Sequence, residues 1–170
     1  RELGCDGGIM VTASHNPAKY NGYKVYGADG CQIANEAADR ILDEINNVDT
    51  FSDYKLVDFE EGLKSGIIEY VSEDTFNAFI DAVSTQTFIG DDIVKNVKIA
   101  YTPLYGTGLR SVTTCLKKNG FTNIEVVKEQ ATPNGDFPTC PYPNPEIREA
   151  LEVGLNVAKE VGADILIATD

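Results

Sequence analysis

The second half of the chain alternates short apolar runs with stretches of helical periodicity. Helices are expected through Leu109, Val112 and Leu116 up to Gly120, and from Asn144-Pro145-Glu146, where proline takes the first helical position, to about Gly162. Strand–helix–strand order implies right-handed crossovers and a parallel sheet with helices on its faces. We therefore predict a three-layer α/β/α domain with a mainly parallel sheet. The predicted strands are Val97–Tyr101, Ile124–Val127 and Asp164–Ala168.

The first half predicts a smaller and incomplete mixed α/β domain. Strands are expected at Gly8–Val11 and Tyr23–Tyr26, then a tight turn at Gly27–Gly30 and a short strand at 31–33. Asn35 is the expected cap of an amphipathic helix that ends at Asn46-Asn47. We place the first domain at 1–48 and the second at 49–170. The acidic segment 49–72 is predicted to be an irregular linker, and Ser72 to cap a second helix that runs to about Thr85.

Charge is unevenly distributed and limits the classes of partner. The net charge is −13, and residues 36–92 hold fifteen acidic against three basic side chains. Nucleic acid and anionic membranes both require a basic face, so the sequence predicts neither as a partner. We interpret the acidic middle as a solvated helical surface rather than a docking patch. No apolar stretch approaches the roughly 18 residues of a membrane span.

Cysteine and histidine usage argues against a zinc site. The four cysteines are widely spaced without a C-x-x-C pair, and the chain has one histidine. Reduced thiols are the expected state, which favours a cytoplasmic location. Ordinary composition, with 42% apolar and 24% charged residues, predicts a globular fold.

The candidate chemistry lies where the first strand ends. The apolar run Gly8–Val11 leads into Thr12-Ala13-Ser14-His15-Asn16-Pro17, so a hydroxyl is expected at the mouth of a sheet, with Lys24 a few residues on. A hydroxyl flanked by proton-handling and cationic side chains suits covalent phosphotransfer. A serine hydrolase is a poorer hypothesis, because neighbours on an extended chain point apart and no G-x-S-x-G elbow exists.

The hexapeptide, with Asn21-Gly22-Tyr23-Lys24 after it, resembles the phosphoserine loop of the α-D-phosphohexomutases. The resemblance implies that Ser14 carries the phosphoryl group and that Lys24 acts as general acid or base. His15 is given a supporting catalytic role, with a structural loop histidine as the alternative, and Asn16 and Asn21 are expected to bind substrate. The implied reaction interconverts hexose 1-phosphate and hexose 6-phosphate through a bisphosphate, with glucose 1,6-bisphosphate as activator.

Asp170 follows the last predicted strand and resembles the first aspartate of the family's D-x-D-x-D-R metal loop. The resemblance implies that Asp170 and a phosphoserine oxygen at Ser14 bind Mg²⁺, an ion suited to hard oxygen ligands. The sequence shows one of the three aspartates, so the chain reads as a segment of a longer protein and is expected to be inactive alone. Tyr105-Gly106-Thr107-Gly108 resembles the family's H-G-x-G segment, and we interpret it as a tight strand-to-helix connection.

Several alternatives stay open. The sequence of residues 20–26 looks most like that of phosphoglucomutases, and specificity for mannose or pentose phosphates is the alternative within the family. A non-catalytic interaction module of mutase ancestry is the alternative from another class. The expected partners are a hexose phosphate and, through the incomplete first domain, a second copy of the chain. Open sheet edges and uncovered apolar faces favour such association.

Overall fold

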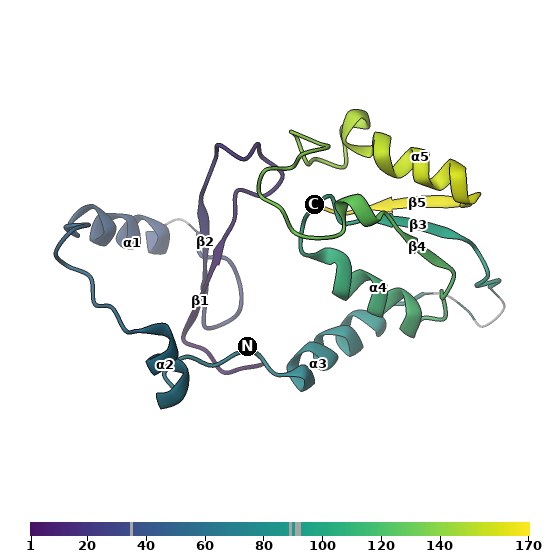
Figure 1. Ribbon diagram of the computed structural model, residues 1–170. Helices are drawn as coiled ribbons and strands as arrows, with labels where there is room; N and C mark the ends of the chain where they lie inside the picture. The colour runs from purple at the N-terminus through teal and green to yellow at the C-terminus, as the bar shows by residue number, and fades with distance from the viewer. Residues whose placement is uncertain (35, 89, 91–92) are drawn as a thin grey trace. The chain divides into compact units, whose positions relative to one another are not determined.

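The computed structural model describes residues 1–34, 36–88, 90 and 93–170, and the chain divides into two compact units (Figure 1). Unit 1 comprises residues 1–10 and 24–76, and unit 2 comprises residues 11–23 and 77–170. The predicted Asn35 cap and part of the predicted 90–92 turn lie outside the described residues. The domain boundary at residue 49 stays a prediction.

Unit 2 is built on a parallel sheet, as predicted. The strand order is β4-β3-β5, with β3 at Ile99–Thr102 in the centre, β4 at Ile124–Val126 and β5 at Ile165–Ala168. Ile99 is in register with Ile124 on one side and with Ile165 on the other. All four residues of β3 are buried, because both edges of the strand are paired and helices cover the sheet.

Helices cover both faces of this sheet and make the three layers (Figure 1). Helix α5, Glu152–Val161, lies on one face, and α4, Gly108–Lys118, lies on the other. Helix α5 packs tightly, since a Cβ on Gly154 would lie 3.1 Å from Leu166 Cδ1. Helix α3, Glu73–Ser84, packs beside α4, and Ser72 Oγ accepts from Thr75 N at its start, as predicted. The α/β/α fold class is confirmed.

Two elements of unit 2 begin two residues or more from the predicted start, while the other boundaries differ by two residues at most. β3 begins at Ile99 rather than Val97. The helix expected from Asn144-Pro145-Glu146 instead starts as a 3₁₀ turn at Arg148–Leu151 and becomes α-helical at Glu152. Asn144 Oδ1 accepts from Glu146 N at 2.9 Å, so the asparagine closes a local turn that competes with helix initiation.

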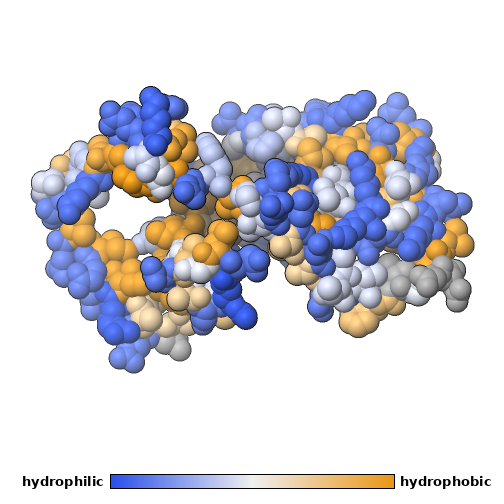
Figure 2. Space-filling view, turned by 90° about the horizontal axis from the view of Figure 1, so that it is seen from below, coloured by the Kyte–Doolittle hydropathy of each residue, from blue (hydrophilic) through white to orange (hydrophobic). Residues whose placement is uncertain are grey.

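Unit 1 contains all but one residue of each of the paired strands β1, Gly7–Val11, and β2, Tyr23–Gly27, and helix α1 at Glu36–Asn46. The short strand predicted at 31–33 is reduced to a single antiparallel bridge between Tyr26 and Gln32. Every residue of β1 is exposed, and Figure 2 shows apolar side chains open to solvent over the part of the chain that carries α1 and α2. No helix among the described residues is long and apolar enough to cross a membrane.

The prediction of an irregular linker over 49–72 was wrong in one respect. A short helix, α2, spans Phe59–Ser65. Asp58 Oδ1 accepts from Glu61 N at its start, and Gly66 ends it with a φ of 75°. These two residues form an ordinary start and stop pair, which the strongly acidic composition of the segment obscured.

Candidate active site

The Ser14 loop belongs to unit 2 and is closed at its base by a hydrogen bond from Thr12 N to Gly22 O at 2.9 Å. Ser14 N donates to Thr12 Oγ1 at 2.9 Å. The backbone N and the side-chain Nδ2 of Asn16 both donate to Ala13 O, at 3.2 and 2.9 Å. Each turn of the loop is therefore held by its own polar side chains.

Ser14 has a left-handed backbone, with a φ of 56°. A residue with a Cβ adopts this region at a cost of about 1–3 kcal/mol, and such conformations persist where the surroundings impose them, often at functional sites. Ser14, His15 and Asn16 are all accessible to solvent. The turn thus presents the hydroxyl of Ser14 on an accessible and locally braced loop.

His15 connects this loop to the carboxyl edge of the parallel sheet. Its Nδ1 lies 3.2 Å from Oδ2 of Asp170, the second residue after β5. Both side chains are a little under half exposed, at 46% and 42%. The predicted phosphoserine loop and the predicted metal-ligating carboxylate are therefore in contact, although 155 positions separate them in the chain.

The backbone at Asp170 rests on the loop that follows β3. Thr169 N donates to Thr102 O at 3.1 Å, and the Tyr101 hydroxyl lies 2.9 Å from Thr169 Oγ1. A Cβ on Gly106 would lie 2.6 Å from the Asp170 carbonyl carbon. Glycine is required there because any side chain would push Asp170 away. The segment 105–108 is the tight strand-to-helix connection expected.

Burial changes the proton affinity of one side chain at this edge. Tyr101 is fully buried, and desolvation raises the pKa of its phenol above the ordinary value, with the hydrogen bond to Thr169 as a smaller opposing influence. The phenol is therefore neutral at physiological pH and acts as a hydrogen-bonding anchor for Thr169.

The other predicted site residues have different positions. Lys24 lies half-buried on β2, in unit 1, and Asn21 is exposed, with its Oδ1 accepting from Gly22 N at 2.9 Å. The roles assigned to Ser14, His15, Asn16, Asn21, Lys24 and Asp170 stay predictions.

The donor set does not by itself fit a resident Mg²⁺ ion. No group of three His, Cys, Asp or Glu side chains that could hold a metal gathers among the described residues. Asp170 supplies one carboxylate, and its Oδ2 is already against His15. Hard-cation sites use about six oxygen ligands, several of them carboxylates or water.

An open hollow of about 430 Å³ lies beside the Ser14 loop. Its lining includes polar, cationic, aromatic and apolar side chains, and no carboxylate among the described residues, although the chain has a net charge of −13. The ammonium of Lys19 lies 5.2 Å from the centre of the Tyr20 ring. Sequence reasoning assigned no role to Lys19 or Tyr142, and the only sequence signal was the place of Lys19 next to the loop. The lining residues are His15, Asn16, Pro17, Lys19, Tyr20, Tyr142, Asn144 and Ile147.

Comparison with known proteins agrees with this geometry. Residues 77–170 match the phosphoglucomutase/phosphomannomutase α/β/α domain II, and residues 1–51 match domain I of the same family. The chain is 35% identical over 170 residues to a phosphoglucomutase of Staphylococcus saprophyticus, covering all of the chain and 30% of that protein. It is also 35% identical over 179 residues to a phosphoribomutase of Saccharomyces cerevisiae, covering 96% of the chain and 28% of that protein.

A solved structure gives the same result. The crystal structure of a Thermus thermophilus protein assigned as a phosphomannomutase superposes with a TM-score of 0.63 at 25% identity, covering all of this chain and 35% of that one. The fold is that of an α/β/α domain with an exposed serine loop beside the carboxyl edge of its parallel sheet. The chain belongs to the phosphoglucomutase/phosphomannomutase family, which confirms the resemblance noted from Ser14 and its neighbours. It spans about three tenths of the length of these curated relatives.

Proposed function

We propose that this chain carries the phosphoryl-transfer loop of a phosphosugar mutase that interconverts hexose 1-phosphate and hexose 6-phosphate. One observation carries the proposal: Ser14 holds a left-handed conformation on an exposed, hydrogen-bonded loop whose next residue contacts Asp170. A fixed hydroxyl beside an acidic sheet edge suits positioning of a phosphoryl group for in-line transfer.

The reaction has two balanced halves. In the first, the bond between phosphorus and Ser14 Oγ breaks as a sugar hydroxyl oxygen bonds to phosphorus. The sugar hydroxyl proton passes to a base, and the freed Ser14 Oγ takes a proton to become a hydroxyl. In the second, Ser14 Oγ bonds to the other phosphorus of the bisphosphate as the bond from that phosphorus to the sugar oxygen breaks. The Ser14 hydroxyl gives its proton to the base, and the freed sugar oxygen takes a proton. Lys24 is the proposed acid and base, and glucose 1,6-bisphosphate is the proposed activator because it phosphorylates Ser14.

The hollow beside the loop supports a phosphorylated sugar as substrate. Lys19 offers a cation, Asn16 and Asn144 offer amides, and Tyr20 and Tyr142 offer flat apolar faces. These groups match the phosphate, hydroxyls and ring of a sugar phosphate. The loop amides of Asn16 and Asn21 are the proposed substrate contacts.

The hexose is proposed to be glucose, because the sequence of residues 20–26 looks most like that of phosphoglucomutases. The relatives named as a phosphoglucomutase and a phosphoribomutase are equally similar at 35% identity, so pentose phosphate specificity is the second candidate. Mg²⁺ in the full-length protein, held by Asp170 with carboxylates beyond those described, would supply charge neutralisation. The four free cysteines favour a cytoplasmic location.

The decisive experiment follows phosphate on Ser14. The full-length protein is incubated with glucose 1,6-bisphosphate, and phosphopeptides are located by mass spectrometry. We expect phosphate on Ser14, and we expect Ser14→Ala to lose more than a hundredfold in mutase rate, equivalent to about 2.7 kcal/mol. Ser52→Ala, at another exposed serine, is the matched control and keeps full rate.

Two other results would contradict the proposal, and a third would contradict one part of it. An unphosphorylated Ser14 in a folded full-length protein would favour the non-catalytic module. Labelling of Ser14 by a fluorophosphonate would favour a hydrolase. Turnover by the 170-residue chain alone would contradict the proposed need for further metal ligands.

A further inference from the structure

A buried chain of polar side chains runs behind the candidate site. Thr102, the last residue of β3, and Gln130, at the end of a 3₁₀ turn at Lys128–Gln130, are both completely buried. The hydroxyl of Thr102 donates to Gln130 Oε1 at 2.7 Å, and Gln130 Nε2 donates to Thr139 Oγ1 at 2.9 Å. Thr139 Oγ1 also lies 3.0 Å from the Tyr105 hydroxyl.

The same glutamine holds the backbone of the loop after β3. Gln130 O accepts from Tyr105 N at 2.9 Å, and Leu104 N donates to Thr102 Oγ1 at 3.1 Å. Leu104 and Tyr105 have φ values of 48° and 64°, an uncommon left-handed pair for residues with side chains. The hydrogen bonds around Gln130 help to hold this turn in its strained conformation, together with those from Gly106 N to Pro103 O at 2.7 Å and from Asn134 N to Tyr105 O at 3.3 Å.

The left-handed turn places Gly106 directly against the backbone of Asp170. The space there admits no Cβ, because one would lie 2.6 Å from the Asp170 carbonyl carbon and 2.7 Å from its oxygen. A small shift of the turn therefore moves Asp170. Because Asp170 contacts His15, the shift reaches the Ser14 loop.

We propose that Gln130 is a positioning residue of the candidate site: it fixes the turn at Leu104 and Tyr105, and this turn sets Asp170 against His15. The importance of that placement for phosphoryl transfer rests on the proposed function. The placement itself does not, and it can be measured in the 170-residue chain without turnover.

His15 makes the measurement direct because it is the only histidine. An ionised carboxylate only accepts hydrogen bonds, so contact with Asp170 requires the proton on His15 Nδ1. Long-range ¹H–¹⁵N spectra distinguish this tautomer from the Nε2-protonated form. All spectra are recorded at one fixed pH, so that they differ only in the substitution.

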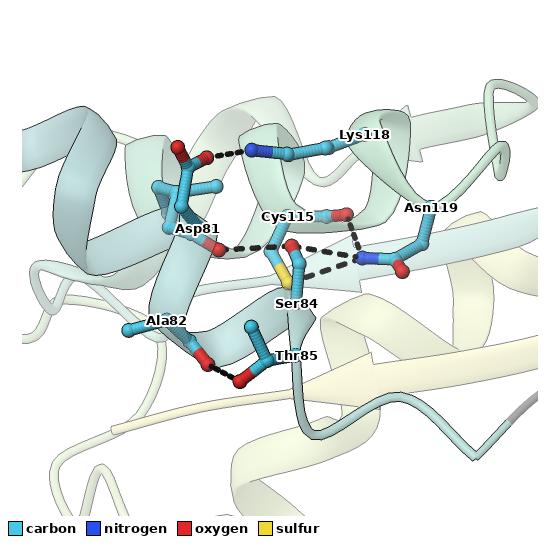
Figure 3. A network of polar contacts seen from close by, with 8 residues as sticks. Asp81, Ala82, Ser84, Thr85, Cys115, Lys118 and Asn119 are labelled. Carbon is cyan, nitrogen blue, oxygen red and sulfur yellow. Dashed lines mark hydrogen bonds and ion pairs between the residues drawn. The ribbon is translucent and has the colours of Figure 1, made fainter.

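The test compares variants of Gln130 with a matched control on another hydrogen-bond network. Gln130→Met keeps the length of the side chain and removes both side-chain hydrogen bonds. Asn119→Leu removes hydrogen bonds to Cys115 O at 2.9 Å and Ser84 Oγ at 3.4 Å, where α3 and α4 meet (Figure 3). Asp170→Ala gives the spectrum of His15 without its partner.

We expect the wild-type chain and Asn119→Leu to show the Nδ1-protonated tautomer. We expect Gln130→Met to lose most of this signature and to approach Asp170→Ala. A wild-type signature retained in folded Gln130→Met would overturn the proposal, and so would its absence from the wild type or its loss in folded Asn119→Leu.

A second pair of variants covers the case in which Gln130→Met does not fold. Thr139→Val removes the acceptor of Gln130 Nε2, whereas Thr139→Ser keeps the hydroxyl. We expect Thr139→Val to weaken the signature and Thr139→Ser to retain it, and equal spectra from the two would contradict the proposal. If these spectra contradict the role of Gln130, the proposed function is unaffected. If Ser14 is found unphosphorylated, the proposed function fails but the role of Gln130 is unaffected.

Discussion

Strands β1 and β3 are short apolar runs of similar length with opposite surroundings. Ile9 in β1 is 70% exposed, whereas Ile99 in β3 is 3% exposed. β3 is paired on both edges and covered by α4 and α5, while β1 pairs with β2 alone. The buried hydrophobic side chains among the described residues all lie in unit 2, between Ile80 and Ala150. An apolar run thus predicts a strand, and its neighbours decide whether that strand forms a core.

The largest contrast is expected in amide hydrogen exchange. Amides of β3 and β5 should open only with global unfolding of unit 2, so their protection should exceed that of β1 and β2 by about a thousandfold or more. Exchange measured by mass spectrometry on the 170-residue chain tests this. If a second copy covers unit 1, protection around Met10 and Val25 should rise with concentration. Equal protection of both units in a strict monomer would contradict the view that unit 2 has a buried core and unit 1 does not.

The same substitution in each strand measures how much each contributes to the free energy of unfolding. Ile99→Ala should lower the free energy of unfolding by about 3 kcal/mol, because it leaves a cavity beside the buried strand. Ile9→Ala, the same change on an exposed strand, should cost under about 0.5 kcal/mol. Urea unfolding followed by circular dichroism gives both values. Similar losses would mean that β1 is covered in solution.

The cysteines divide between the units and report their accessibility. Cys5 and Cys31 in unit 1 are exposed, whereas Cys140 in unit 2 is buried, and burial raises the pKa of its thiol. Because the thiolate is the reactive form, iodoacetamide at pH about 8 should modify Cys140 at least about tenfold more slowly than Cys5. Peptide mass spectrometry follows each site. Equal rates in the native chain, and not only in urea, would contradict the burial of Cys140.

Tyr101→Phe should have the smallest effect. Loss of the hydrogen bond to Thr169 should cost about 1 kcal/mol at pH 7. Burial raises the pKa of Tyr101 in the folded state, so its stabilisation is complete below pH about 10, the unfolded value, and is lost as pH rises through the folded value. The thermal stability should therefore fall less steeply above pH about 10 in Tyr101→Phe than in the wild type. If the thermal stability of Tyr101→Phe fell with alkaline pH as steeply as that of the wild type, Tyr101 would not be the buried phenol that ionises.

Sequence patterns predicted the fold because its signals are local. Alternating strands and helices define the parallel sheet, and Gly120 and Gly162 end their helices with φ values of 90° and 64°. The start of α2 was missed because it depends on a local hydrogen bond at Asp58, and α5 begins later than predicted because a local hydrogen bond at Asn144 closes a turn there instead. Apolar pattern alone does not register such a bond.

The candidate site divides in the same way. Ser14 could be singled out from its neighbours in the sequence, but its left-handed backbone could not, since serine has no preference for that region. The contact between His15 and Asp170 and the network at Gln130 join residues that are far apart in the chain. Only the folded sheet brings them together.

The contact between His15 and Asp170 also fixes the order in which the site can be assembled. Asp170 is translated 155 residues after His15, so the serine loop leaves the ribosome before its partner does. Closing so long a loop in an unstructured chain would cost about 4–5 kcal/mol of entropy, and a folded sheet reduces this by holding the ends near each other. The serine loop is therefore joined to the sheet edge only after the parallel sheet has formed. A nascent or misfolded chain lacks the contact between His15 and Asp170.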